Sequence, residues 1–279
     1  MRALAAPPKL PGGPYVMGVV NVTPDSFSDG GRYGDDAARA ADAGAALLDA
    51  GADIIDVGGE STRPGAAPVD LAEERRRVLP VVSALARLGA PVSIDTMKPA
   101  VARAAIEAGA IVWNDVNALQ APEAVETAAA LGCGVVVMHM QGSPATMQAA
   151  PRYRDVVSDV ADALRGRLRV LAAAGVHDVW IDPGIGFGKT LEQNIALLRA
   201  LPALRALAPV LVGASRKSFI GRIESRDGAP VSHEGARLGG SVAAAVFAAR
   251  RGAAMVRVHD VAETVQALRV ARALEEGSS

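Results

Sequence analysis

The chain alternates between short apolar runs, mostly β-branched, and longer stretches rich in Ala, Leu, Glu and Arg. A short continuous apolar run is typical of a parallel strand that is covered on both faces. We therefore expect strands at 15–21, 53–58, 91–95, 110–115, 134–140, 178–182, 209–215 and 254–259.

The longer stretches have the apolar spacing of amphipathic helices, as at 37–52 and 157–175. A glycine stands just before most of the expected strands, where it would end the preceding helix. These glycines are Gly51, Gly89, Gly109, Gly132, Gly175 and Gly252. Strands that alternate with helices in this way indicate βαβ units and a parallel sheet.

Eight such units predict one α/β domain, a (β/α)8 TIM barrel, which needs about 250 residues. The barrel would cover residues 15–275, with a flexible N-terminal segment at 1–14 and a flexible tail at 276–279. A doubly wound open sheet fits the same alternation and is the alternative fold.

The composition excludes several classes of protein. The 29 basic and 30 acidic residues give a net charge of −1, so no overall field favours nucleic acid or an anionic membrane. The single cysteine, Cys133, excludes an internal disulfide and a cysteine-based zinc site. No apolar run reaches the ~18 residues of a membrane span, and the N-terminal stretch lacks the apolar core of a signal peptide. We expect a cytoplasmic protein.

Polar residues stand at the carboxyl end of every expected strand, where barrel enzymes assemble their active sites. The strand ends carry Asn21, Asp56, Asp95, Asn114 with Asp115, His139, Asp182, Ser215-Arg216-Lys217, and Arg257 with His259. Any one of these residues could instead cap the next helix, and Asp260 fits that alternative best, because Asp260 and Glu263 have the spacing of a capping box. A whole ring of buried charges is costly unless a ligand or mutual pairing satisfies it.

This set of donors and acceptors suits a flat heterocycle that carries amino, ring N–H and carbonyl groups. Arg257 and His259 suit an anion beside that ring, phosphate above all. Asn21 could give its amide oxygen to Mg²⁺ that arrives with a diphosphate.

Three loops are rich in glycine. The loops at 21–35 and 58–68, which hold Phe27 and Arg63, have the composition of mobile lids. The loop "DPGIGFGKT" at 182–190 lacks the glycine spacing of a phosphate-binding loop. It fits a loop of close backbone approach in which Phe187 lies against a ligand.

With these residues in place, the chain resembles the dihydropteroate synthases, the folate-pathway enzymes that sulfonamides inhibit. The resemblance runs from about Val16 to Ala273 and includes "GVVNVTPDSFSDGG", "IIDVGGESTRPGA", "SIDTMKPAVARAAIEAGA", "IDPGIGFGKT", "LVGASRKSFIG" and "VRVHDVAETVQA". It implies that (7,8-dihydropterin-6-yl)methyl diphosphate condenses with 4-aminobenzoate to give 7,8-dihydropteroate and pyrophosphate.

The resemblance also implies roles for individual residues. The pterin diphosphate would be bound by Thr62, Asp95, Asn114, Met138, Asp182, Phe187, Lys217, Arg257 and His259. The 4-aminobenzoate would be bound by Phe27, Arg63, Pro64, Phe187 and Ser218. Mg²⁺ would be held by Asn21, with help from Asp25. The residues expected to act directly in the reaction are Lys217, Arg257, His259 and Asp95.

The family is thought to lose diphosphate with the assistance of Mg²⁺, after which the arylamine attacks the pterin methyl carbon. No enzyme nucleophile is needed, and none is predicted. The family is usually dimeric, so a homodimer is expected. Two alternatives share the motifs in part: a pterin-binding paralogue that has lost turnover, and a folate-binding methyltransferase domain.

Overall fold

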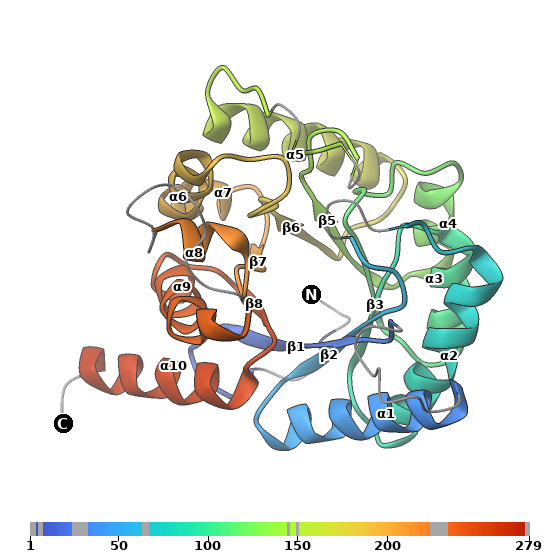
Figure 1. Cartoon of the computed structure of the whole chain (residues 1–279). Helices are drawn as coiled ribbons and strands as arrows, with labels where there is room; N and C mark the ends of the chain where they lie inside the picture. Colours follow the sequence, from blue (N-terminus) through green and yellow to red (C-terminus); the bar gives the residue numbers. More distant parts are fainter. Residues whose placement is uncertain are drawn as a thin grey trace.

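The computed structural model describes Leu4 and residues 8–23, 33–62, 67–143, 146–148, 151–223 and 234–276. In these residues a ring of parallel strands is surrounded by helices (Figure 1). The strands are β1 Tyr15–Asn21, β2 Ile54–Gly58, β3 Val92–Asp95, β4 Val112–Asp115, β5 Gly134–Met138, β6 Val179–Asp182, β7 Leu211–Val212 and β8 Met255–Val258.

The strand order confirms the barrel. Across the described residues, the eight strands lie in the order β6-β5-β4-β3-β2-β1-β8-β7. A parallel bridge between Ile181 and Val210 then brings β6 against the start of β7. The two ends of the sheet therefore meet, which an open doubly wound sheet does not allow. Strand β7 is shorter than the predicted 209–215.

The helices cover the outside of the strand ring (Figure 1). They are α1 Tyr33–Asp49, α2 Leu71–Arg87, α3 Pro99–Glu107, α4 Ala124–Leu131, α5 Val156–Ala173, α6 Leu191–Arg199, α7 Leu201–Leu204, α8 Ser218–Ile223, the 3₁₀ turn η2 Glu234–Arg237, α9 Leu238–Arg250 and α10 Val261–Glu276. All six glycines predicted to end helices have positive φ, which confirms that assignment. Among the described helices, none has the length and apolar character needed to cross a membrane.

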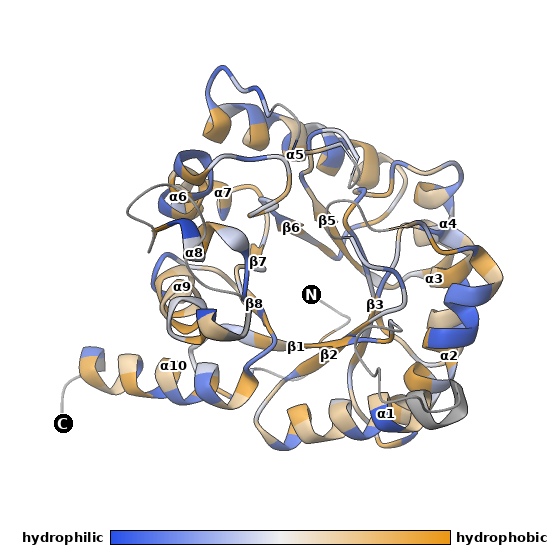
Figure 2. Ribbon diagram, viewed as in Figure 1, coloured by the Kyte–Doolittle hydropathy of each residue, from blue (hydrophilic) through white to orange (hydrophobic). Residues whose placement is uncertain are grey.

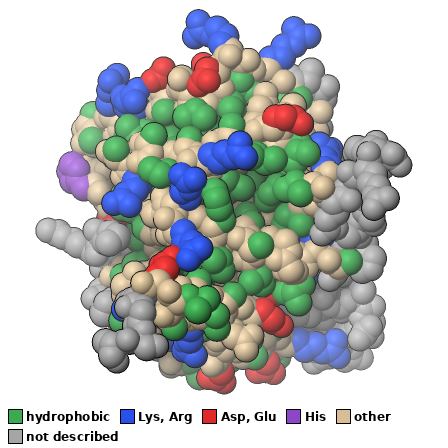
Figure 3. All heavy atoms as spheres, turned by 90° about the vertical axis from the view of Figure 1, so that its left-hand side faces the viewer, with side chains coloured by type: hydrophobic (Ala, Val, Ile, Leu, Met, Phe, Trp, Pro, Cys, Tyr) green, Lys and Arg blue, Asp and Glu red, His purple; other side chains and the backbone are tan. Residues whose placement is uncertain are grey.

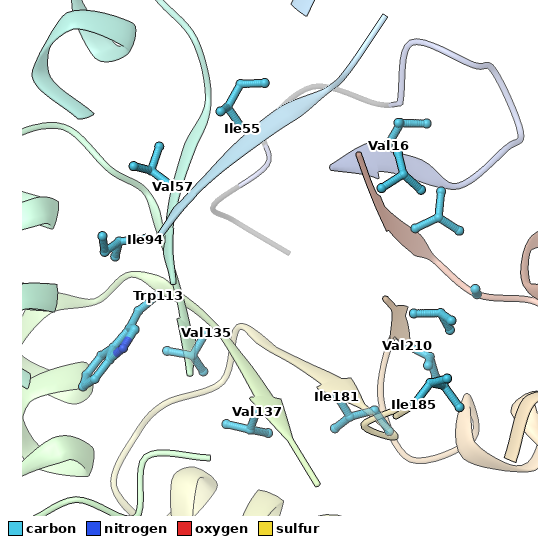
Figure 4. Packing of buried hydrophobic residues seen from close by; sticks show 14 of the residues in the cluster. Val16, Ile55, Val57, Ile94, Trp113, Val135, Val137, Ile181, Ile185 and Val210 are labelled. Carbon is cyan, nitrogen blue, oxygen red and sulfur yellow. The ribbon is translucent and has the colours of Figure 1, made fainter. Parts of the chain in front are cut away.

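The core has two layers, because successive side chains of a strand point to opposite faces. The outer layer lies between strands and helices, where Val57, Ile94 and Trp113 from the neighbouring strands β2, β3 and β4 lie side by side (Figure 4). The hydropathy colouring shows the hydrophobic strands β1 and β2 and helices that mix hydrophobic and hydrophilic positions (Figure 2).

The inner layer fills the barrel itself below its carboxyl end. Its buried residues are Leu4, Tyr15, Met17, Ile54, Val112, Val136, Trp180, Leu211 and Met255. Nearly all come from strands, and the rings of Tyr15 and Trp180 meet edge to face with their centroids 5.8 Å apart. This packed floor is the surface on which the polar strand ends stand.

Candidate active site

The carboxyl ends of the strands bring their polar residues to one mouth of the barrel. We call this set the polar crown: Asn21, Asp56, Asp95, Asn114, Asp182, Lys217, Arg257 and His259. Each stands on a strand or within five residues of a strand end, and the parallel order turns all these ends to the same side. The structure therefore gathers residues that are widely separated in the sequence.

Arg257 lies at the centre of the crown. Its Nε donates to Asp56 Oδ2 at 2.6 Å, and its Nη2 donates to Asp95 Oδ2 at 2.8 Å. The amide of Asn114 donates to the same oxygen of Asp56 at 2.9 Å. One guanidinium thus joins strands β2, β3 and β8, with Asn114 on β4 tied to the same cluster.

Asp56 was predicted to stand at the end of the second strand, but no binding or catalytic role was predicted for it. Its side chain is fully buried, and its Oδ1 has no hydrogen-bond partner in the described part of the chain. A signal was available, because Asp56 stands two positions after Ile54 and so shares its inward direction. What the sequence does not show is the partner, Arg257, which lies 201 residues away.

The electrostatics of this cluster shift the titration of Asp95. Burial raises the pKa of Asp95 to about 7, the nearby carboxylates of Asp56 and Asp115 add to the rise, and Arg257 opposes it. Two carboxylates that share one guanidinium leave the cluster with an excess of acceptors. Such a site suits a ligand edge with several N–H groups.

Lys217 and Asp182 form the opposite part of the crown. The Lys217 ammonium donates to the carbonyl of Ile185 and lies 4.6 Å from the centre of the Phe187 ring. Burial lowers the pKa of Lys217 to about 8, while Asp182 counteracts that fall. Burial also raises the pKa of Asp182, whose Oδ1 accepts the N–H of Gly184 at 2.7 Å.

The loop after β6 approaches its neighbours closely, in line with the interpretation of its glycines. Gly184 has φ +70°, and a Cβ there would collide with the carbonyl oxygen of His139. A Cβ at Gly186 would come within 3.0 Å of Lys217 Cδ. This close packing holds Phe187 beside Lys217.

Lys189 is a second residue that the sequence interpretation passed over. Its side chain is buried, and its Nζ donates to the carbonyls of Phe187 at 2.8 Å and His139 at 3.2 Å. Burial lowers the pKa of Lys189 to about 7. The same Nζ lies 3.2 Å from His139 Nδ1, and burial lowers the pKa of His139 to about 4. The only sign of this residue in the sequence was a lysine in a glycine-rich loop. That pattern does not show where the lysine side chain points.

The remaining predicted residues divide into two groups. In the described chain, His259 Nδ1 lies 3.0 Å from Ser215 Oγ, and Met138 is buried opposite Asp182. Thr62 is half-buried just after β2, and Ser218 is exposed at the start of α8. Asp25, Phe27, Arg63 and Pro64 lie outside the described residues.

Asp115 accepts the N–H groups of Asn117 and Leu119, so its carboxylate orders the turn after β4.

The described residues offer limited metal-binding capacity. Nowhere in the described part of the chain do three His, Cys, Asp or Glu side chains form a group that could hold a metal ion. The side chains of Asn21 and Asp95 both lie beside Gly58. A Cβ added to Gly58 would be 3.7 Å from Asn21 Oδ1 and 3.5 Å from Asp95 Cβ. A metal here would need further oxygen ligands from a bound substrate.

Comparison with known proteins agrees with this geometry. The sequence profile of a family described as "Pterin binding enzyme" matches residues 17–259. The dihydropteroate synthase of Escherichia coli K12 is 48% identical over 264 residues, which cover 93% of this chain and 91% of that protein.

Solved structures are similar over the same extent. The Xanthomonas albilineans dihydropteroate synthase with 4-aminobenzoic acid has a TM-score of 0.87 at 47% identity, covering 95% of this chain and 94% of the other. The Yersinia pestis enzyme in a sulfonamide drug complex has a TM-score of 0.88 at 45% identity, covering 95% of both chains.

Proposed function

Because the chain belongs to the dihydropteroate synthase family of pterin-binding enzymes, we propose that its polar crown binds and activates the substrates of that family's reaction. The enzyme is a transferase of folate biosynthesis. It condenses (7,8-dihydropterin-6-yl)methyl diphosphate with 4-aminobenzoate and releases 7,8-dihydropteroate and pyrophosphate. The observation that carries the assignment of the site is the joining of Arg257 to Asp56 and Asp95 beside Lys217 and Asp182.

The pterin would lie across the crown with its polar edges on the buried groups. Asp95 and Asp182 would accept hydrogen bonds from its amino and ring N–H groups, and Lys217 would donate to a ring acceptor. Asn114 would be oriented for the ring by its bond to Asp56. Phe187 and Met138 would contact its apolar faces.

The diphosphate would meet the cations at the end of β8. A guanidinium has five N–H donors, so Arg257 keeps donors for phosphate oxygens while Asp56 and Asp95 hold it in place. His259, fixed by Ser215, and Thr62 would complete the anion site. These donors would stabilise the charge that builds on the leaving group.

The reaction then needs no covalent enzyme intermediate. The bond between the pterin methyl carbon and the diphosphate oxygen breaks, and the diphosphate leaves with the electron pair. The amine nitrogen of 4-aminobenzoate forms the new bond to that carbon and gives up one proton. The enzyme's part is to hold both substrates in line, to stabilise charge and to exclude water.

We also propose Mg²⁺ as the metal. The oxygen donor of Asn21 fits it, because Mg²⁺ takes few protein ligands and completes its shell with phosphate oxygens and water. Asp25, the second expected ligand, lies outside the described residues. When bound, the ion would act as a Lewis acid toward the diphosphate.

The 4-aminobenzoate would bind beside Phe187 and the exposed Ser218, together with Phe27, Arg63 and Pro64. A sulfonamide would compete for this place, since a Yersinia pestis relative forms a complex with such a drug.

We further propose a cytoplasmic homodimer. Helices α9 and α10 expose apolar side chains that a monomer would leave in water, among them Phe247, Val270 and Leu274. Figure 3 shows hydrophobic side chains gathered on the face to which these helices belong. Sedimentation of the protein at micromolar concentration tests this dimer, and a monomer would contradict it.

The function is tested by an assay of pyrophosphate release. Release should require both the pterin diphosphate and 4-aminobenzoate, stop with EDTA and be competed by a sulfonamide. Release without the amine would indicate a hydrolase. No release at all would indicate a paralogue without turnover, and methyl transfer to a corrinoid would indicate the methyltransferase alternative.

A further inference from the structure

The turn after β7 has an unusual backbone at Arg216. Its φ is +59°, in the left-handed region that residues with a Cβ seldom adopt. Ser215 and Lys217 flank it, and Lys217 belongs to the polar crown. The surrounding structure must therefore hold this turn in place.

The peptide groups of Arg216 are fixed to the start of α9. Its N–H donates to the hydroxyl of Ser241 at 2.8 Å, and its carbonyl accepts from Arg237 Nη1 at 2.9 Å. The Ser241 hydroxyl in turn donates to the carbonyl of Arg237 at 2.7 Å. Both Ser241 and Arg237 are buried, so the hydrogen bonds that hold the turn are made to buried side chains.

The side chain of Arg216 reaches in another direction, to the end of β8. Its Nε donates to Asp260 Oδ2 at 3.1 Å, and its Nη2 donates to Asp260 Oδ1. Asp260 stands directly before α10, the position that the sequence predicted for a helix cap, and its carboxylate is bound by an arginine 44 residues earlier in the chain. Asp260 directly follows His259, whose Nδ1 lies 3.0 Å from Ser215 Oγ.

We propose that Arg216 and Asp260 form a positioning pair, which keeps Lys217 on the β7 turn and His259 on β8 in the mutual arrangement that the reaction requires. This proposal rests on the roles proposed above for Lys217 and His259. Neither member of the pair is expected to touch a substrate. Arg216 acts through Lys217, which follows it in the chain. Asp260 acts through His259, which precedes it.

The pair is better suited to positioning than to stability. The side chain of Arg216 is 38% exposed and that of Asp260 is 15% exposed, and partly exposed ion pairs add little to folding. Its bidentate geometry nevertheless fixes direction. We therefore expect its loss to affect kinetics more than the melting temperature.

A double-mutant cycle tests the pair. Arg216→Met and Asp260→Asn should each lower kcat/KM for the pterin diphosphate about 10- to 100-fold, because small misplacements of binding groups are costly. The double variant should lose little more than either single variant, because the two residues act as one unit. The affinity for inorganic pyrophosphate, measured by calorimetry, should fall in parallel.

Two further variants separate the backbone from the ion pair. Arg216→Gly and Arg216→Ala both remove the guanidinium, but only glycine adopts the left-handed turn without strain. The glycine variant should therefore keep more activity than the alanine variant. Arg216→Lys, which returns a cation to Asp260, should recover part of the activity lost in Arg216→Met. Equal activity of the glycine and alanine variants would refute the role of the turn.

A matched control is the surface pair of Arg165 and Asp162 on α5, whose arginine side chain is 44% exposed. Arg165→Met should leave kinetics unchanged. Wild-type kinetics in Arg216→Met and Asp260→Asn would overturn the positioning pair. If instead Lys217→Ala proved fully active while the cycle still showed coupling, the role of Lys217 would be wrong and the pair would position His259 alone.

Discussion

The two ends of the barrel interior are built from the same strands but have opposite character. On β4, β6 and β8 an apolar residue of the inner layer is followed two positions later by a polar one. The pairs are Val112 and Asn114, Trp180 and Asp182, and Met255 and Arg257, and β2 adds Ile54 and Asp56. Two positions along a strand keep the same inward direction, so these pairs are successive levels of one interior.

The comparison shows what each level contributes. The lower level buries hydrocarbon and aromatic surface, which stabilises the fold by about 25 cal/mol per Å². The upper level holds charges whose burial is unfavourable unless they are paired, and Arg257 pairs with both Asp56 and Asp95. The lower level is therefore expected to determine stability, and the upper level binding.

The largest effect should come from removing a charge of the upper level. Lys217→Ala should lower kcat/KM for the pterin diphosphate by about 10⁴-fold, because a site built around hydrogen bonds fails when a buried partner is missing. Steady-state kinetics of dihydropteroate formation measure this loss.

The matched control for that variant is a lysine at the other end of the barrel. Lys9 donates its Nζ to the carbonyl of Leu48, and Lys9→Ala should leave the kinetics unchanged. Full activity in Lys217→Ala would show that the crown does not bind the substrate as proposed.

A pair of variants on one strand sharpens the contrast between the levels. Trp180→Ala should lower the free energy of unfolding by about 3–5 kcal/mol, as large cavities in cores do. Asp182→Asn, two residues further on, should change stability far less but reduce kcat/KM by about 10²- to 10³-fold through the lost acceptor charge.

Denaturant unfolding and kinetics on the same two proteins measure both quantities. Similar effects of the two variants on both quantities would contradict the division into a stabilising and a binding level.

Much of this contrast could be predicted from the sequence. The strand ranges came from apolar runs, and the six glycines that end helices depend on local backbone conformation alone. Asp95, Asn114, Asp182, Lys217 and Arg257 could be placed at the mouth because parallel strands turn all their carboxyl ends to one side.

The remainder depends on which side chains meet across the barrel, and a one-dimensional pattern does not contain that. The bond between Asp56 and Arg257 requires the stagger of closed strands, and the direction of Lys189 requires the path of the β6 loop. Asp260 shows the limit of local interpretation: it stands directly before α10, where its spacing placed a helix cap, but the pattern does not show that its carboxylate binds Arg216.

The pKa values of the upper level predict a narrow pH optimum. Binding needs Asp95 ionised and Lys217 protonated. As the pH rises toward the Asp95 pKa of about 7, kcat/KM should increase up to tenfold per pH unit, and it should fall above the Lys217 pKa of about 8. Asp182, whose pKa burial also raises, would contribute to the acidic limb.

Two substitutions assign the limbs of this profile. Asp95→Asn should flatten the acidic limb of whatever activity remains. Lys217→Arg should move the alkaline limb to higher pH, because a guanidinium keeps its proton at pH 8 and above. Lys189 has a pKa of about 7 and is the competing candidate for a limb. A profile that keeps both limbs in these variants but loses one in Lys189→Met would transfer the titration to Lys189.

The smallest effect is expected at Leu4, which is buried in the inner layer together with Met17 and Trp180. Leu4→Ala should lower the free energy of unfolding by about 2 kcal/mol, the lower end of the range for buried leucines, because Leu4 is still 7% exposed. The kinetics should be unchanged, since the packed inner layer separates Leu4 from the crown. Thermal unfolding measures this difference, with Leu88→Ala on the exposed end of α2 as the control. An unchanged melting temperature would mean that the N-terminal segment contributes nothing to the inner layer, as its predicted flexibility implies. A loss of activity would mean that the inner layer and the polar crown are not independent.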